Sequence, residues 1–176
     1  KANLYRYFES REAILLSILI EELDQWVTAL TEDLNGATET GDVVAVAQIF
    51  ADSISDRVRL NELMSTFAPV LERNLTVQSV EMEKSELRSF FVRLIQPLCN
   101  ALPQFSKSQA NEFLIMQTVF QMGLWPHANP SETVSEVLSQ EAFADLRMNF
   151  AERVRWHALI LLRGLESVDP PRVRPN

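Results

Sequence analysis

The sequence contains few of the residues that disulfide frameworks and sheet-rich folds require. Its 176 residues include one cysteine, Cys99, four glycines and two tyrosines. A single cysteine excludes an internal disulfide and, with no signal peptide, favours a reducing, cytoplasmic compartment. Scarce glycine beside abundant Leu, Ala, Glu and Gln disfavours the many turns of a sheet-rich chain. We therefore predict an all-α fold.

Long apolar runs are also missing. The longest, residues 14–16 with 18–20, is broken by Ser17 and closed by Glu21 and Glu22, well short of a membrane span. We expect a soluble protein with no membrane partner. With 47% hydrophobic residues, the chain has enough apolar surface for one sizeable core.

Net charge is unevenly distributed along the chain. The formal net charge is −8, yet the first eleven residues carry Lys1, Arg6 and Arg11 against Glu9 alone. An acidic body is repelled by phosphate, so we expect any nucleic-acid contact at this end.

Residues 1–16, which read KANLYRYFESREAILL, have the pattern of a helix that enters a DNA groove. Leu4 and Phe8 share one face, which can be buried, while Asn3 and Arg6 lie on the opposite face. Asn3 and Arg6 can donate to base edges, and Lys1 and the tyrosine hydroxyls can reach phosphates. At the start of the next helix, backbone N–H groups and the Arg11 cation favour a phosphate.

The same segment resembles the end of the recognition helix in the tetracycline-repressor (TetR) family, through Leu4, Tyr5, Tyr7, Phe8, Arg11, Glu12 and Leu15. The resemblance implies double-stranded operator DNA as a partner, and we expect residues preceding Lys1 that hold the first two helices of the DNA-binding domain. Residues 1–34 would form the end of the helix-turn-helix domain and a connector helix, 35–170 an effector-binding and dimerisation domain, and 171–176 a tail. The predicted DNA contacts are Lys1, Asn3, Tyr5, Arg6, Tyr7 and Arg11.

Helix-capping residues and apolar periodicity divide the remainder into helices. Pro69 is expected to bend or break the third, Pro97 to kink the fourth and Pro126 to end the fifth. The predicted ranges are 10–34, 42–56, 60–74, 76–102, 106–125, 131–139, 141–147 and 149–166.

The helices near 107–125 and 149–166 are apolar on more than one face, which predicts burial against a second subunit as well as against their own core. A central core helix of a monomer is the alternative. In the TetR family these two helices form a four-helix bundle with their copies, so the resemblance implies a homodimer. The predicted interface residues are Phe113, Val119, Phe120, Trp156, Leu159 and Leu162.

The resemblance also implies a small-molecule effector pocket among the middle helices. Large apolar side chains with a few amides would suit an apolar or amphipathic effector, although such residues at helical spacing also serve as ordinary core packing. The candidates are Met64, Phe67, Leu71, Phe90, Phe91, Phe113, Gln117, Phe120 and Gln121.

No catalytic, metal or cofactor motif is recognisable, so we expect neither an enzyme nor a cofactor. His127 and His157 stand without a carboxylate or cysteine at ligand spacing, so no metal site is expected. Cys99 is interpreted as a small buried residue, because redox sensing would require exposure and a low pKa.

The predicted function is a ligand-responsive transcriptional regulator that acts as a repressor. An effector in the body would pivot the connector helix and misalign the two recognition helices, releasing the operator. The alternative is a helical protein-interaction module that does not bind DNA.

Overall fold

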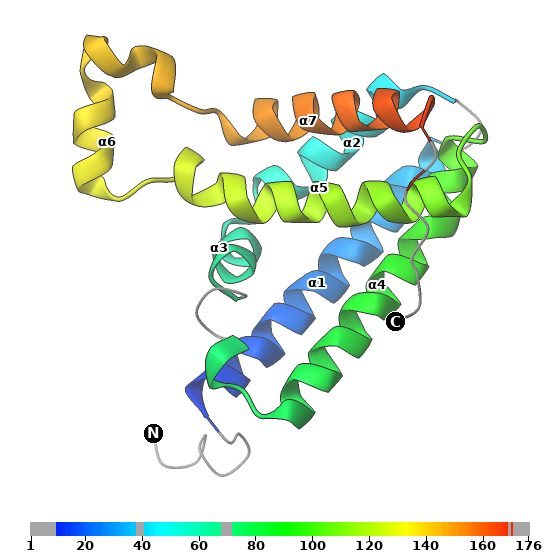
Figure 1. Cartoon of the computed structure of the whole chain (residues 1–176), viewed down its shortest axis with the longest axis horizontal. Coiled ribbons are helices and arrows are strands. Elements are labelled where there is room, and N and C mark those ends of the chain that lie inside the picture. Colours follow the sequence, from blue (N-terminus) through cyan, green and yellow to red (C-terminus); the bar gives the residue numbers. More distant parts are fainter. Residues whose placement is uncertain (1–9, 38–40, 68–71, 169, 171–176) are drawn as a thin grey trace.

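The computed structural model describes residues 10–37, 41–67, 72–168 and 170, and this part of the chain is helical with no strand (Figure 1). The all-α prediction is confirmed. The long helices are α1 (Arg11–Gly36), α2 (Val43–Ser55), α3 (Val58–Thr66), α4 (Val77–Ala101), α5 (Lys107–Ala128) and α7 (Phe150–Leu165). The short ones are η3 (Glu72–Asn74), α6 (Glu132–Ser139) and η4 (Glu141–Leu146).

Most long helices begin at the predicted capping residues. The Ser10 hydroxyl accepts a hydrogen bond from the backbone N–H of Ala13 at 3.1 Å, and the Asp42 carboxylate accepts one from Val44 at 2.8 Å. Ser106 and Gln109 form a reciprocal capping box at the start of α5. These bonds satisfy backbone donors that the first turn of a helix leaves without partners, which fixes where each helix starts.

Pro97 and Pro126 both lie inside helices. Helix α4 continues past Pro97 as predicted, and the expected kink there stays a prediction, whereas α5 continues through Pro126 to Ala128 instead of ending at Trp125. Pro126 is so close to the end of α5 that few helical hydrogen bonds remain to be lost, and Asn129 closes the helix by donating to the carbonyl of Trp125 at 2.9 Å. The third predicted helix ends earlier, at Thr66. Pro69 lies outside the described residues.

The helices are arranged as two crossing layers (Figure 1). Helices α1 and α4 run side by side, while α5 and α7 lie side by side across one end of that pair, with α2 packed on α7. The rings of Phe50 in α2 and Phe113 in α5 meet edge to face at 4.8 Å, and Trp125 meets Phe150 of α7 in the same way at 4.9 Å. The buried residues of α1 belong to this common core.

Residues 130–149 form an arm that projects from the ends of α5 and α7 (Figure 1). Neither α6 nor η4 contains a buried residue. The Arg147 guanidinium holds the arm together, because it donates to the carbonyls of Leu138 at 2.6 Å, Ser139 at 2.8 Å and Gln140 at 3.2 Å. These hydrogen bonds join parts of the arm to one another and not to the core.

Candidate functional site

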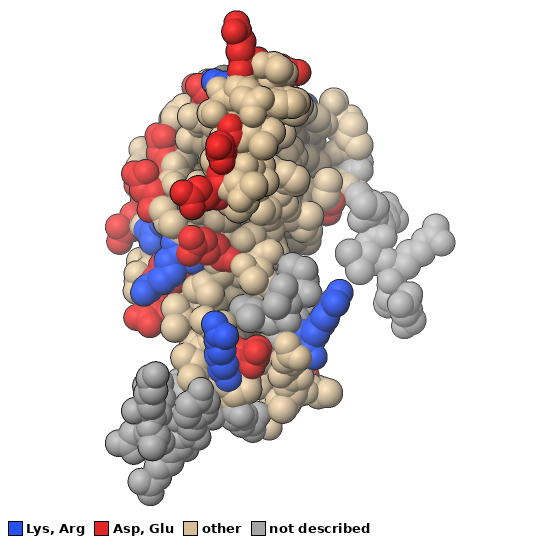
Figure 2. All heavy atoms as spheres, turned by 90° about the vertical axis from the view of Figure 1, so that its left-hand side faces the viewer, with Lys and Arg blue, Asp and Glu red and all other residues tan. Residues whose placement is uncertain are grey.

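The N-terminal end of α1 carries one of the predicted DNA contacts. Arg11 is exposed at the first position of α1, directly after the capping Ser10. Figure 2 shows Lys and Arg side chains mainly in the lower half of this face, toward the start of α1, and Asp and Glu side chains over its upper part. The other predicted DNA contacts lie outside the described residues: Lys1, Asn3, Tyr5, Arg6 and Tyr7. The contact set stays a prediction.

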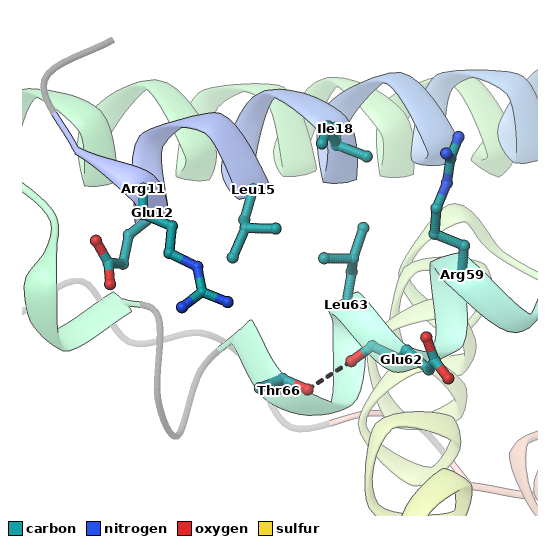
Figure 3. Close-up of a pocket in the computed structure, with 8 residues that line it drawn as sticks. All are labelled: Arg11, Glu12, Leu15, Ile18, Arg59, Glu62, Leu63 and Thr66. Atoms are coloured by element: carbon teal, nitrogen blue, oxygen red, sulfur yellow. Dashed lines mark hydrogen bonds between the residues drawn. The ribbon is translucent and has the colours of Figure 1, made fainter. Parts of the chain in front are cut away.

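A cavity of 490 Å³ separates the start of α1 from α3. Figure 3 shows Leu15 and Ile18 of α1 facing Leu63 of α3, with Arg11 at one end and Arg59 at the other. An apolar centre with charged ends matches an amphipathic molecule. The remaining lining residues are Glu12, Glu62 and Thr66.

Local sequence patterns do not predict this cavity, because its two walls lie more than forty positions apart in the chain. Arg59 is held at its rim by an ion pair with Glu22 of α1, which also joins α3 to α1. Of the lining residues, Arg11 alone had been assigned a role, and that role was DNA contact. The cavity therefore adjoins the end of the chain expected to bind DNA.

Most of the predicted effector residues are core residues. Met64, Phe67, Phe90, Phe113, Gln117 and Gln121 are buried, Phe91 and Phe120 are half-buried, and Leu71 lies outside the described residues. None of these residues lines the cavity between α1 and α3. Their role in effector binding stays a prediction.

Two buried glutamines one turn apart on α5 differ in their hydrogen bonding. The Gln117 amide is occupied: its Nε2 donates to the carbonyl of Val154 at 3.4 Å, and its Oε1 lies 2.7 Å from Nδ1 of His157. In contrast, both amide atoms of Gln121 are buried without a hydrogen-bond partner among the described residues. Gln121 is therefore the one member of the predicted effector set with unused polar atoms in the core.

The environment of His157 favours its neutral form. Burial lowers the pKa of its imidazole below the usual 6.5, and its ring stacks on Phe120 at 3.8 Å. Because the Nε2 of Gln117 faces a carbonyl, the Oε1 accepts from His157, which places the imidazole proton on Nδ1. His157 is therefore a hydrogen-bonded link between α7 and α5.

Helices α5 and α7 expose an apolar surface, here called the α5–α7 face, which consists of Ile115, Met116, Val119, Trp156 and Ile160. Val119 is 64% exposed and Trp156 is 55% exposed. Several large exposed apolar side chains on two neighbouring helices are typical of a protein-protein contact. Val119 and Trp156 belong to the predicted interface, whereas Met116 and Ile160, one helical turn away from them, do not.

Two of the predicted interface residues require correction. Phe113 and Leu162 are both 0% exposed, so they pack inside their own chain and are not available on the surface for a second subunit. Phe120 and Leu159 are half-buried beside the α5–α7 face. Apolar periodicity finds the two helices but does not distinguish their inner from their outer face when both are apolar.

A metal site, a reactive cysteine or a membrane-spanning helix would each add a further function to the described part of the chain. There, no group of three or more His, Cys, Asp or Glu side chains is placed to hold a metal ion. Burial raises the pKa of the half-buried Cys99 thiol, although Lys107 acts in the opposite direction. The thiol is protonated at neutral pH, whereas a reactive cysteine requires the thiolate. Within the described residues no helix is long and apolar enough to span a membrane.

The described part of the chain is all-helical, with the pair α1 and α4 crossed at one end by the apolar pair α5 and α7. The family model described as the tetracyclin repressor-like C-terminal domain matches residues 20–169. The chain therefore belongs to the TetR family of transcriptional regulators, whose members are typically not enzymes. No curated protein matches the sequence.

Proposed function

We propose that the protein is a homodimeric, ligand-responsive DNA-binding regulator that acts as a repressor. The observation that carries this proposal is the cavity between α1 and α3, because one side of it is the first two turns of the connector helix. A molecule bound there would touch the same helix that carries Arg11. Family membership supports the general role in transcription.

The DNA-binding end is supported by charge. The chain is acidic overall, so phosphate is disfavoured over most of the body, and Arg11 is exposed where α1 begins. Its position at a helix N-terminus adds backbone N–H groups and the positive end of the helix dipole. This end would meet the DNA backbone.

Effector control would follow from the position of the cavity. Leu15 and Ile18 face Leu63 across it, so an occupant would alter the spacing of α1 and α3. A ligand that prefers the state in which the recognition helices do not match the half-site spacing weakens operator binding. By thermodynamic linkage, DNA weakens ligand binding by the same factor. We propose an amphipathic acid, whose carboxylate would bind Arg11 and whose apolar chain would lie on Leu15, Ile18 and Leu63.

Decanoate is a suitable probe of the effector site. With an operator selected from a random DNA pool, we expect decanoate to release DNA from the full-length protein and to raise its melting temperature. Leu63→Trp should fill the cavity and abolish both effects while DNA binding persists. Val92→Trp, at an exposed position on α4, is the matched control. Equal responses of wild type and Leu63→Trp would contradict the cavity as effector site.

DNA contact is tested separately through Arg11. In the full-length protein, Arg11→Ala should weaken binding to operator and random DNA alike, and it should lower the slope of log affinity against log salt by roughly one. Arg88→Ala, at an exposed position on α4, is the control. If the wild-type protein shows no salt-dependent DNA binding, the alternative of a helical protein-interaction module replaces this proposal.

A further inference from the structure

A second cavity, of 420 Å³, opens beside the α5–α7 face, and here it is called the Gly123 cavity. It lies where α5 meets the end of the arm and the start of α7. Its walls are Val119, Phe120, Gly123, Leu124 and His127 of α5, Met148 of the arm and Arg153 of α7. The lining is thus mainly apolar, with one guanidinium and one imidazole at its edge.

Gly123 keeps this cavity open. It lies inside α5, and a Cβ atom built on it would meet nothing within 4 Å. Glycine is a poor helix former, and nothing in the chain's own packing requires the missing side chain at this position. The consequence of glycine here is a hollow on an otherwise apolar surface.

Trp156 is an exposed aromatic side chain close to the Gly123 cavity. It is the one exposed aromatic residue in the described part of the chain. Arg153, which lines the cavity, precedes it by three positions on α7, so the two lie on neighbouring parts of one helix face. A projection and a hollow therefore lie side by side on the α5–α7 face.

We propose that Trp156 of each protomer inserts into the Gly123 cavity of the other. This inference rests on the homodimer of the proposed function and identifies its central contact. A two-fold axis between a projection and an adjacent hollow brings each projection into the other protomer's hollow, which makes the contact self-complementary. A second copy of this chain supplies both halves of the fit.

The lining of the cavity favours an aromatic occupant. The Arg153 guanidinium can lie over the face of an indole ring, and the Met148 sulfur can contact the edge of the ring. Phe120 offers a further ring surface, itself fixed by stacking on His157. Buried tryptophans surrounded by apolar contacts are frequent hot spots of protein interfaces.

Sedimentation of the wild-type chain and two variants over a concentration series tests the contact. Gly123→Leu should fill the hollow, and Trp156→Ala should remove the projection, each raising the dimer dissociation constant about tenfold or more. Gly36→Leu at the end of α1 and Val92→Ala on α4 are matched controls, since both positions are exposed and lie outside α5 and α7. Melting curves should show that all four variants remain folded.

Mixing the two variants gives a sharper test. A Trp156→Ala protomer has an open cavity, and a Gly123→Leu protomer has an intact tryptophan, so a mixed dimer retains one contact while neither parent homodimer retains any. Native mass spectrometry of differently tagged chains should therefore show mixed dimers in excess of the statistical proportion. Statistical mixing would overturn the proposal.

Tryptophan fluorescence provides an independent readout. Trp26 and Trp125 are buried within the chain, so the change of emission on dimer formation should come from Trp156. Wild-type emission should shift to shorter wavelength as concentration rises, and this shift should disappear in Trp156→Ala.

The outcomes separate this inference from the proposed dimer. A wild-type chain that stays monomeric at micromolar concentration removes both. A wild-type dimer whose dissociation constant is unchanged by Gly123→Leu and Trp156→Ala removes this inference alone. The proposal is also overturned if wild type and Gly123→Leu have the same dimer dissociation constant while 1-anilinonaphthalene-8-sulfonate binds the wild type but not Gly123→Leu. In that case the cavity holds a small ligand.

Discussion

At the residue scale, the two buried glutamines of α5 allow a controlled comparison. Gln121→Met removes an amide without a described hydrogen-bond partner, so it should raise the free energy of unfolding by about 1 kcal/mol or more. Gln117→Met, in contrast, leaves Val154 and His157 without their partner and should lower it by about 1 kcal/mol. Urea denaturation of both variants measures the difference. Destabilisation by Gln121→Met would show that its amide is already satisfied.

The His157 environment makes a prediction about pH. The pKa of this imidazole is lower in the folded chain than the usual 6.5, so below that value the unfolded chain takes up the proton more readily. The stabilisation from neutral His157 is therefore complete above pH 6.5 and is lost as the pH falls through the lower pKa of the folded state.

Melting temperatures between pH 7.5 and 5 measure this effect. The wild type should lose more stability over this range than His157→Gln, which keeps a hydrogen-bond donor but does not titrate. His127→Gln removes an exposed histidine and is the control, because all carboxylates remain the same. Parallel curves for wild type and His157→Gln would contradict the assignment.

At the element scale, the arm depends on one side chain. Arg147→Ala removes donors to three backbone carbonyls at the end of α6, and at an exposed site this should lower the free energy of local opening by about 1–2 kcal/mol. Hydrogen exchange over residues 132–146 should become roughly tenfold faster, while the core helices keep their protection. Glu141→Ala, an exposed change in the same arm, should leave the exchange rates unaltered.

At the scale of the whole molecule, the burial of a residue on α7 decides whether its substitution affects dimer formation or folding. Ile160 is 53% exposed on the α5–α7 face, so Ile160→Asp should place a charge in the proposed interface and yield a folded monomer. Leu162, two residues later, is 0% exposed, so Leu162→Asp should unfold the chain. Light scattering and circular dichroism distinguish the two results. A folded monomer from Leu162→Asp would contradict its place in the core.

Much of the fold could be predicted because its signals are local. A cap such as Ser10 acts on a residue three positions away, and helical periodicity relates residues three or four positions apart. These signals placed the starts of most long helices. They were less accurate at Pro126, because α5 tolerates the loss of a hydrogen bond so close to its end.

The sequence by itself thus determined the helical class, most helix starts and the resemblance to TetR regulators that the family match supports. Tertiary structure alone decided which apolar side chains of α5 and α7 face outward, that Gln117 meets His157, and that Arg11 borders a cavity with Leu63. The physical reason is the distance along the chain over which each interaction acts. Capping and periodicity are set by neighbours along the chain, whereas a cavity or an exposed face exists only once distant helices have packed against one another.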